Sequence, residues 1–373
     1  MRNTHYILIC FFLFLLGCTH SGRNKQTEIT SPTVEEKPLI LLFAGDVMNH
    51  IPQSNAAYIS SSNSYDYRPC FQYVKTYIEN ADVAFCNLEF PLAGKPYSGF
   101  PTFSGPDEML DALQWIGFDV IQTANNHMMD RGNVGNQRTI KEIVKRGLKF
   151  VGSYTGVEQK DSVYPLIISK SNFKLAILNY TYSVNLHIMK PSKVNILDSI
   201  AIKNDILKAR SLGTDFIVAT VHWGDEYQLV NNSYQRKWVN VLINSGVDLI
   251  VGSHPHVVQN FEIIQHGKTS IPVFYSLGNF ISNQREKNKN GGILARIEID
   301  MTHKILSNVS YHPFYVFKGV LNNKYQYFLL PTDDYIADPS SYSIPMKDSV
   351  ELMYFHHKTK ETLNNIPTYQ ERL

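Results

Sequence analysis

GVDLIV, residues 246–251, shows the arrangement that decides the fold: a glycine after a helix-like stretch, then an aspartate, then a short apolar run. The same unit occurs at residues 80–85 (NADVAF), 117–121 (GFDVI) and 213–218 (GTDFIV). Three of the four units carry glycine directly after the helix-like stretch, where a left-handed residue is favoured. Short apolar runs of this kind are typical of strands buried on both faces, so the repeat predicts a largely parallel sheet.

The segments between these strands carry the signals of amphipathic helices. Pro106 precedes two acidic residues and an apolar face, which favours a helix start. Asn232 or Ser233 is expected to cap a second helix that ends at Gly246. Helices that alternate with buried strands predict an α/β domain. After Ile271 the strand-like runs follow one another without clear helices, so we expect them to be antiparallel.

Composition narrows the classes of function. The 373 residues are 43% apolar and 18% charged, and the formal net charge is only +2. These values exclude a disordered polyelectrolyte. They also give no reason to expect nucleic acid as a partner. No Walker-type phosphate-binding motif is present in the sequence, so ATP use of that type is not expected.

The N-terminus has the pattern of a targeting segment. Residues 6–16 are an apolar run of 11, too short to span a bilayer. The run leads into Leu-Leu-Gly-Cys, which resembles the lipobox of bacterial lipoproteins. Residues 1–17 are therefore predicted to be a lipoprotein signal peptide that is cleaved before Cys18. Lipidated Cys18 and a polar tether over residues 18–37 would anchor the protein at the bacterial cell envelope. The alternative is a cytosolic chain with an apolar N-terminus.

The remainder is predicted to form one large domain over residues 38–318. A Tyr-rich C-terminal extension over residues 319–373, with one possible helix at 349–363, is expected to pack on it. After cleavage, Cys70 and Cys86 are the remaining thiols. They are compatible with one disulfide, but Cys86 lies in an apolar strand-like run and is interpreted as a buried thiol.

Polar side chains suited to metal binding follow five successive predicted strands. They are Asp46; Asn87 and Glu89; Asn125, Asn126, His127 and Asp130; His222 and Glu226; and His254 and His256. Carboxyl ends of strands are where ligands bind in open α/β sheets. Carboxylate, imidazole and amide oxygen together form a ligand set for Zn, Mn or Fe. The alternative is that these residues only cap the sheet edge.

One histidine of this set is a candidate for acid catalysis. His127 follows Asn126 directly, and an imidazole there is placed to protonate a leaving alkoxide. Either Asp130 or Glu226 is expected to orient it by accepting its second N–H. His50 lies four residues past Asp46 and is able to approach the same region. Asn279 follows Gly278 and is expected to form a turn.

Six motifs in a fixed order resemble the CapA family, which is associated with bacterial poly-gamma-glutamate capsule synthesis. They are GDVM (45–48), NLE (87–89), ANNH (124–127), HWG (222–224), GSHPH (252–256) and SLGNF (276–280). The resemblance covers roughly residues 39–312. That family is similar to the calcineurin-like metallophosphoesterases, which implies a layered α/β/β/α sandwich around a two-metal site.

The resemblance implies a role for each matching residue. It makes six residues metal ligands, with Glu89 in the bridging position: Asp46, Glu89, Asn126, His222, His254 and His256. His127 would be the catalytic imidazole, with Asp130 and Glu226 beside it. The sequence departs from the wider superfamily at Met48, where a histidine ligand is usual, and at Glu89, where an aspartate is usual. These departures are compatible with one firmly held divalent ion, or with a second ion completed by substrate.

Three functions fit these observations. The first is a lipid-anchored, metal-dependent hydrolase with an anionic envelope polymer or a phosphoester as substrate. The second is a non-catalytic factor that binds the polymer during capsule assembly. The third is a periplasmic nucleotidase or nuclease. For the first two, the expected partners are the polymer, the membrane through Cys18, and other capsule-synthesis proteins.

Overall fold

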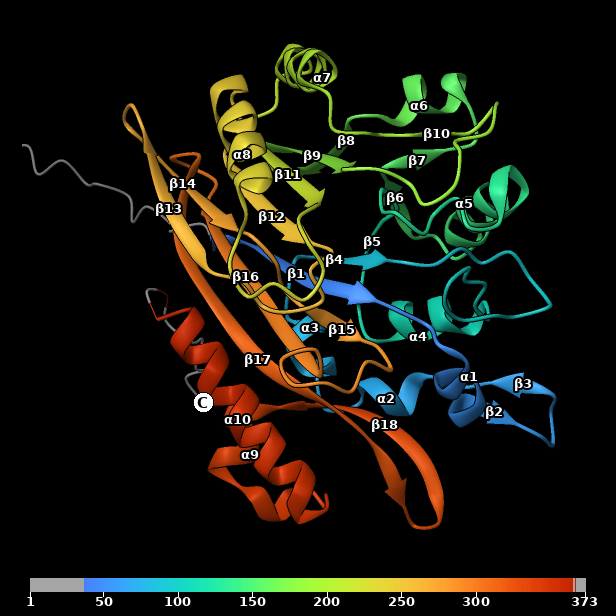
Figure 1. The fold of residues 1–373 in the computed structure, drawn as a ribbon. Coiled ribbons are helices and arrows are strands. Elements are labelled where there is room, and N and C mark those ends of the chain that lie inside the picture. The colour runs from blue at the N-terminus through green and yellow to red at the C-terminus, as the bar shows by residue number, and fades with distance from the viewer. Residues whose placement is uncertain (1–36, 365, 367–373) are drawn as a thin grey trace, which may run out of the picture. The chain divides into compact units, whose positions relative to one another are not determined.

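The computed structural model describes residues 37–364 and residue 366, which form two large β-sheets with helices on their outer sides (Figure 1). The arrangement confirms the expected α/β/β/α sandwich. The predicted signal peptide, Cys18 and nearly all of the tether lie outside the described residues. Within the described part of the chain, no helix is both long enough and apolar enough to cross a membrane.

The larger sheet has eight strands in the order β18-β17-β16-β1-β4-β5-β6, and β15 also pairs with β1. Strands β1, β4, β5 and β6 are parallel, whereas β16, β17 and β18 add an antiparallel half. The strands are β1 (Leu39–Val47), β4 (Val83–Leu88), β5 (Val120–Gln122), β6 (Lys149–Val151), β15 (Asn279–Ile281), β16 (Gly291–Asp300), β17 (Ile305–Leu321) and β18 (Lys324–Pro331).

The smaller sheet has six strands in the order β13-β14-β12-β11-β9-β8, of which β9, β11, β12 and β14 are parallel. They are β8 (Leu166–Lys170), β9 (Phe173–Thr181), β11 (Phe216–His222), β12 (Leu249–Ser253), β13 (Phe261–His266) and β14 (Thr269–Phe274). Two short ribbons complete the described strands: β2 (Tyr58–Ile59) with β3 (Ser64–Tyr65), and β7 (Ser153–Tyr154) with β10 (Lys193–Val194).

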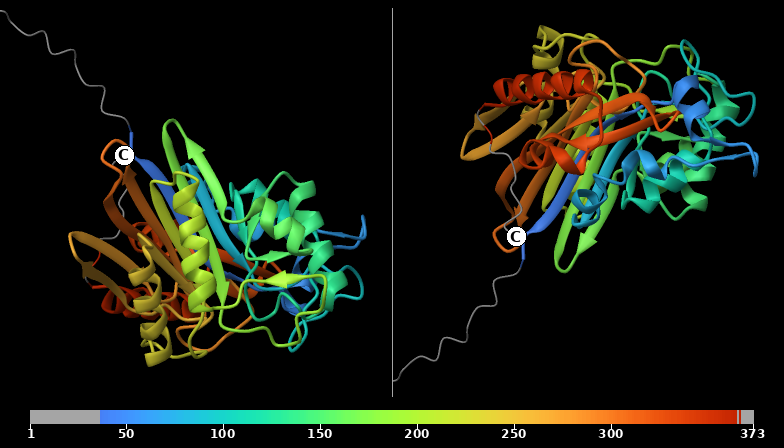
Figure 2. Two further views of the ribbon diagram at one scale, coloured as in Figure 1. Left: turned by 90° about the horizontal axis from the view of Figure 1, so that it is seen from above. Right: turned by 90° about the horizontal axis from the view of Figure 1, so that it is seen from below.

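Helices form the outer layers (Figures 1 and 2). Helices α7 and α8 contact each other and lie on the six-stranded sheet, on the side away from the eight-stranded sheet. Helices α9 and α10 pack against β17, and α5 packs against β6. The helices are α1 (Ile51–Ala57), α2 (Arg68–Phe71), α3 (Lys75–Glu79), α4 (Glu108–Trp115), α5 (Gly132–Lys145), α6 (Val157–Val163), α7 (Ser199–Ser211), α8 (Ser233–Ser245), α9 (Thr332–Ala337), the 3₁₀ turn η1 (Pro339–Ser341) and α10 (Met346–Thr362).

The repeated aspartate has one structural role in all four units. Each carboxylate accepts the backbone N–H of a residue in the neighbouring parallel strand, at 2.7–2.8 Å. The backbone N–H of each aspartate donates to the carbonyl of that same residue, at 2.8–3.0 Å. The pairs are Asp82 with Ile40, Asp119 with Ala84, Asp215 with Lys174, and Asp248 with Ile217. Each aspartate therefore fixes the register of two strands where they begin.

Replacing Asp248 with alanine is expected to lower the free energy of unfolding by about 1–3 kcal/mol, because the Ile217 N–H loses its acceptor. Asp248→Asn keeps an acceptor oxygen and is expected to cost less. Urea denaturation measures both. The exposed Asp161→Ala is the control, with a change within about 0.5 kcal/mol. Equal losses for Asp248→Ala and Asp161→Ala would contradict this role.

Several local expectations are confirmed. Gly117, Gly213 and Gly246 all have positive φ, at 105°, 74° and 104°. Asn232 caps α8 through a reciprocal pair of bonds with Gln235. Cys70 and Cys86 are free thiols, and Cys86 is buried, as interpreted from its strand-like run. The predicted C-terminal helix is present as α10.

Three expectations from the sequence differ from the structure. The strands after Ile271 were expected to be antiparallel, but β14 runs parallel to β12 and β15 runs parallel to β1. The strands that follow the repeated aspartates do not share one sheet, because β4 and β5 belong to the eight-stranded sheet and β11 and β12 to the six-stranded sheet. An apolar run indicates that a strand is buried on both faces, but it does not indicate to which sheet the strand belongs. In addition, β17 runs continuously across residues 318 and 319, and β18 pairs with it, so residues 319–331 extend the main sheet.

Candidate metal centre

Two groups of buried acidic and imidazole side chains meet at the carboxyl ends of strands from both sheets. One group is Glu89, His222 and His254, and the other is Asp46, Glu89 and His256. Within each group, the candidate ligand atoms lie within 4.8 Å of one another. Glu89 belongs to both groups, which is the arrangement of a carboxylate between two adjacent ion positions.

The strands explain how these residues meet. Asp46 is near the end of β1, and Glu89 directly follows β4, its parallel neighbour. His222 ends β11, while His254 and His256 follow β12, which is parallel to β11. Both histidines after β12 have positive φ, 101° for His254 and 58° for His256. Such backbone strain in non-glycine residues is concentrated at functional sites.

Glu89 is the most unusual group of the site. Its side chain is fully buried, and neither carboxylate oxygen has a hydrogen-bond partner in the structure. Its Oε1 lies 3.4 Å from His222 Nε2 and 3.8 Å from His256 Nε2. Burial and the neighbouring Asp46 carboxylate raise the pKa of Glu89 well above its usual value. A buried carboxyl group in such surroundings is ionised only when a cation compensates its charge, so the surroundings of Glu89 fit a divalent ion.

The imidazoles also suit a metal. Burial lowers the pKa of His222 and of His254 well below the usual value, so both rings are neutral and keep a lone pair. Their ring centroids are 4.6 Å apart, and Nδ1 of His254 is buried without a hydrogen-bond partner. Neutral imidazole nitrogen is the form that ligates transition ions. The donor set therefore fits Zn, Mn or Fe.

Asp46 and His256 are held by fixed hydrogen bonds. Asp46 Oδ1 accepts from Asn87 Nδ2 at 2.8 Å, and its Oδ2 accepts from the backbone N–H of His254 at 3.1 Å. His256 Nδ1 lies 3.0 Å from Asn279 Oδ1, which leaves Nε2 on the side of Glu89. The sequence favoured a turn at Asn279 over a substrate contact, but the residue begins β15 and its Oδ1 contacts His256. A hydrogen bond to the ring nitrogen that does not face the ion fixes the ring orientation of a histidine ligand.

Asn126 and His127 lie where the sequence predicted them. Asn126 Oδ1 is 2.8 Å from His222 Nε2. His127 Nδ1 is 2.7 Å from Asp130 Oδ2, which also accepts from the backbone N–H of Phe103 at 2.8 Å. The Phe103 ring packs edge-on against His127, with centroids 4.7 Å apart. His127 therefore has one nitrogen held by a carboxylate and the other available for a reacting group.

Glu226, Met48 and His50 complete the comparison with the sequence predictions. Of the two carboxylates expected beside His127, Asp130 makes the contact within the described residues, and Glu226 is exposed. Met48 is buried among apolar side chains. His50 packs edge-on against the same Phe103 ring that contacts His127, with centroids 5.3 Å apart.

Ser253 and Tyr182, to which the sequence assigned no role, touch the site, as does Asn87, which it placed among the strand-end side chains. Asn87 Nδ2 and Ser253 Oγ lie 3.3 Å and 3.1 Å from His222 Nδ1. The Tyr182 ring packs on His254, with centroids 4.8 Å apart. All three lie at or directly after strand ends. Position therefore identifies them as neighbours of the site, but only the folded chain shows their contacts.

Comparison with known proteins places the chain in a family. Residues 40–284 match the family described as bacterial capsule synthesis protein PGA_cap. The chain is 28% identical over 300 residues to the capsule biosynthesis protein CapA of Bacillus anthracis, a match that covers 76% of this chain and 70% of that protein. It is 27% identical over 289 residues to the PGA biosynthesis protein CapA of Bacillus subtilis (strain 168), covering 76% of this chain and 73% of that protein.

Among solved structures, the NAD nucleotidase NadN of Haemophilus influenzae aligns with a TM-score of 0.48 and 10% identity, over 87% of this chain and 63% of that one. The family match spans every residue of the two ligand groups as well as Asn126 and His127. The chain belongs to the PGA_cap family of bacterial capsule synthesis proteins.

Proposed function

We propose that this protein is a metal-dependent hydrolase that acts on an anionic polymer of the bacterial envelope. The observation that carries the proposal is Glu89, a fully buried carboxylate with no hydrogen bond, shared by two ligand groups. The ordered pair of His127 and Asp130 lies beside them, since Asn126 contacts His222. A structural cap of the sheet edge would satisfy Glu89 with hydrogen bonds, which the fold does not supply.

Six residues would hold one or two divalent ions such as Mn, Zn or Fe: Asp46, Glu89, Asn126, His222, His254 and His256. Bound ions of this kind lower the pKa of water and polarise the bond under attack. Asn87, Ser253 and Asn279 would keep the imidazoles in orientation through their hydrogen bonds.

His127 would supply the proton that the leaving group needs. Its Nδ1 is held by Asp130, so the ring is kept in one orientation and the opposite nitrogen is presented for proton transfer. Asp130 is itself fixed by the Phe103 backbone and stabilises the imidazolium form. The His127–Asp130 pair would donate its proton in the same way to the leaving group of an ester and to that of an amide.

A cation beside the site supports an anionic substrate. The Lys289 ammonium lies 3.3 Å from the centroid of the Tyr227 ring, and that ring stacks on His256 with centroids 6.1 Å apart. The backbone carbonyl of Lys289 accepts from Asn279, which also contacts His256. Lys289 is therefore tied to the site once through its side chain and once through its backbone, and its ammonium also pairs with Glu286 at 3.5 Å. One relative carries PGA biosynthesis in its name, and poly-γ-glutamate has one carboxylate for each residue.

Lys289→Gln is expected to raise the KM for poly-γ-glutamate by about fivefold and to leave kcat nearly unchanged, because it removes an attraction that substrate and transition state share. Steady-state kinetics at low and high salt measure the effect, which should shrink at high salt. Lys287→Gln is the matched control, since Lys287 is exposed and lies over the Tyr354 ring. An equal rise in both variants would rule out a specific role for Lys289.

The direct test of the function is metal analysis combined with an activity screen. Purified protein is analysed by plasma mass spectrometry and assayed against poly-γ-glutamate and a panel of phosphodiesters and nucleotides. Turnover that a chelator removes and the ion restores supports a hydrolase. The buried Met48 in place of a histidine is the observation that favours the second candidate, a non-catalytic polymer-binding factor. Bound metal and polymer without turnover in any assay would establish that second function instead.

We also propose anchoring of the protein at the cell envelope through lipidated Cys18. The support is the apolar run of 11 residues that leads into Leu-Leu-Gly-Cys. Cys18→Ser is expected to abolish labelling by a clickable fatty-acid probe in growing bacteria and to shift the protein out of the membrane fraction. Labelling that persists in Cys18→Ser would show that the anchor assignment is wrong, whatever the activity of the domain.

A further inference from the structure

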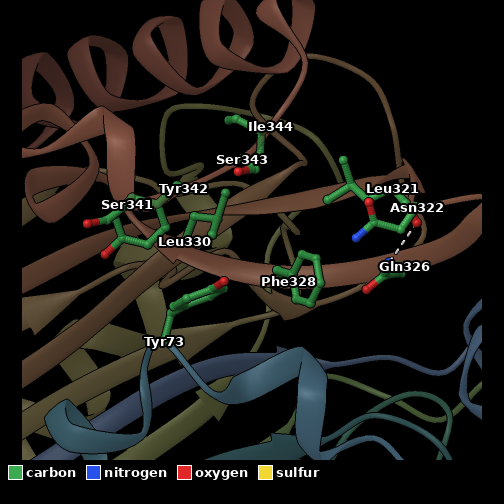
Figure 3. A pocket seen from close by; sticks show the side chains of 10 residues that line it. All are labelled: Tyr73, Leu321, Asn322, Gln326, Phe328, Leu330, Ser341, Tyr342, Ser343 and Ile344. Atoms are coloured by element: carbon green, nitrogen blue, oxygen red, sulfur yellow. Dashed lines mark hydrogen bonds between the residues drawn. The ribbon is translucent and has the colours of Figure 1, made fainter.

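The C-terminal part of the chain builds a cavity of about 220 Å³ in which no residue of the candidate metal centre takes part (Figure 3). Figure 3 shows Tyr73 on one side and Ser343 and Ile344 on the opposite side. Asn322 and Gln326 lie at one end of it and Tyr342 at the other. The family match ends at residue 284, and Tyr73 is the only lining residue inside it.

Three aromatic rings from three separate segments meet in this cavity. Tyr73, from the turn between α2 and α3, packs edge-on against Phe328 of β18 at 5.9 Å and against Tyr342 at 5.2 Å. Phe328 is nearly buried, but Tyr73 remains 36% exposed and Tyr342 is half-buried. Aromatic surface that is held in place but left open is suited to stack against a planar or cyclic ligand.

The polar groups of the cavity carry no charge. Two amides, Asn322 and Gln326, and two hydroxyls, Ser341 and Ser343, line it together with the rings. Gln326 Nε2 donates to the carbonyl of Leu321 at 2.9 Å, which holds its amide in one position. Burial raises the pKa of Tyr342 to about 12, so that phenol is neutral at physiological pH. No Asp, Glu, Lys, Arg or His is among the lining residues.

We infer that this cavity binds a neutral sugar ring. The open aromatic surface suits the apolar C–H face of a pyranose, and the amides and hydroxyls suit its hydroxyl groups. The Ser341 hydroxyl already donates to Asp338 at 2.6 Å, which leaves the amide oxygens and the Ser343 hydroxyl to bond a ligand. An anionic ligand would lack a cation here, and a lipid chain would cover these polar groups without hydrogen-bonding to them. The volume is below the roughly 300–1,000 Å³ of pockets for drug-sized ligands, which favours a single ring. The inference does not depend on the metal centre.

Saturation-transfer NMR of the full chain tests this, with methyl β-glucoside, methyl N-acetyl-β-glucosaminide and sodium glucuronate as separate probes. At least one neutral probe is expected to bind with a dissociation constant of about 1 mM, as befits a ligand of this size. Tyr342→Ala is expected to weaken that binding by about tenfold, and glucuronate is expected to bind more weakly than either neutral probe. Ser343→Trp, which fills the cavity from an exposed position, is expected to abolish it.

Tyr354→Ala is the matched control, because Tyr354 is an exposed tyrosine of α10 outside the cavity. It should leave binding unchanged. Circular dichroism checks that each variant is folded. If Tyr342→Ala disturbs its loop, Ser343→Trp still tests the cavity, because it fills the space and leaves Tyr342 in place. Absence of binding for both neutral probes overturns the inference. So does equal binding of glucuronate, or binding that survives in Ser343→Trp.

Discussion

Glu89→Gln is expected to remove metal from both ion positions at once and to lower turnover by about 10³-fold. The reason is that Glu89 is the only residue common to the two ligand groups, and an amide has one oxygen and no charge. Loss of the ion removes several kcal/mol of transition-state stabilisation. Metal content per chain and kcat/KM are the two measurements.

In the metal-free protein, Glu89→Gln is expected to have a favourable effect on stability. Without an ion, burial and the neighbouring Asp46 raise the pKa of Glu89, so the wild-type chain must take up a proton there in order to fold at neutral pH. Glu89→Gln removes the free-energy cost of burying this ionisable group, so its metal-free form is expected to be more stable than the metal-free wild type by about 1 kcal/mol. Adding metal should stabilise the wild type by about 2.7 kcal/mol at 100 times the dissociation constant and leave the variant unchanged.

Chemical denaturation with and without the ion separates these effects. The control is Glu158→Gln, which removes an exposed carboxylate and should follow the wild type in both conditions. If Glu89→Gln still binds a full complement of ions, Glu89 is not a ligand. If its metal-free form is less stable than the wild type, the carboxylate has a structural partner that the geometry does not reveal.

His127→Ala and His254→Ala are expected to fail in different ways. His127→Ala should retain metal while turnover falls by about 10²–10⁴-fold, because a general acid is lost and Asn126 still contacts His222. His254→Ala should lose metal and turnover together, because it removes a ligand whose Nδ1 is buried without another partner.

Asp130→Asn provides an internal check, since it keeps the size of the residue that holds His127. It should lower kcat less than His127→Ala does and leave metal content unchanged. Equal metal loss in His127→Ala and His254→Ala would make His127 a ligand and end the proposed assignment of roles. His303→Ala, at an exposed histidine paired with Asp300, serves as the neutral control.

Much of the local structure could be predicted because its causes are local. Asn232 caps α8 and Gly246 ends it through bonds within the same stretch of chain. The candidate ligands were also predictable, since each occupies the end of a strand that the apolar pattern identifies. The family resemblance then supplied the second sheet, which the apolar pattern alone did not distinguish from the first.

The rest depends on contacts between distant parts of the chain. Asn279 contacts His256, and Ser253 contacts His222, through side-chain bonds for which the sequence pattern has no signal. The sequence also left open whether Asp130 or Glu226 contacts His127, because that contact too depends on the folded chain. The sequence pattern predicts that the C-terminal strands are antiparallel. It does not predict that β17 and β18 pair beside β16, because that pairing depends on tertiary contacts.

The distribution of the ligands over both sheets has a consequence for how the protein is made. Asp46 and Glu89 emerge from the ribosome long before His222, His254 and His256, and neither candidate ligand group is complete until the chain has passed His254. Neither proposed ion position can therefore exist on an unfolded chain. An ion would be taken up only where folding is completed. The supply of metal at that place, as well as the chemistry of the candidate ligands, would then determine which ion the finished protein contains.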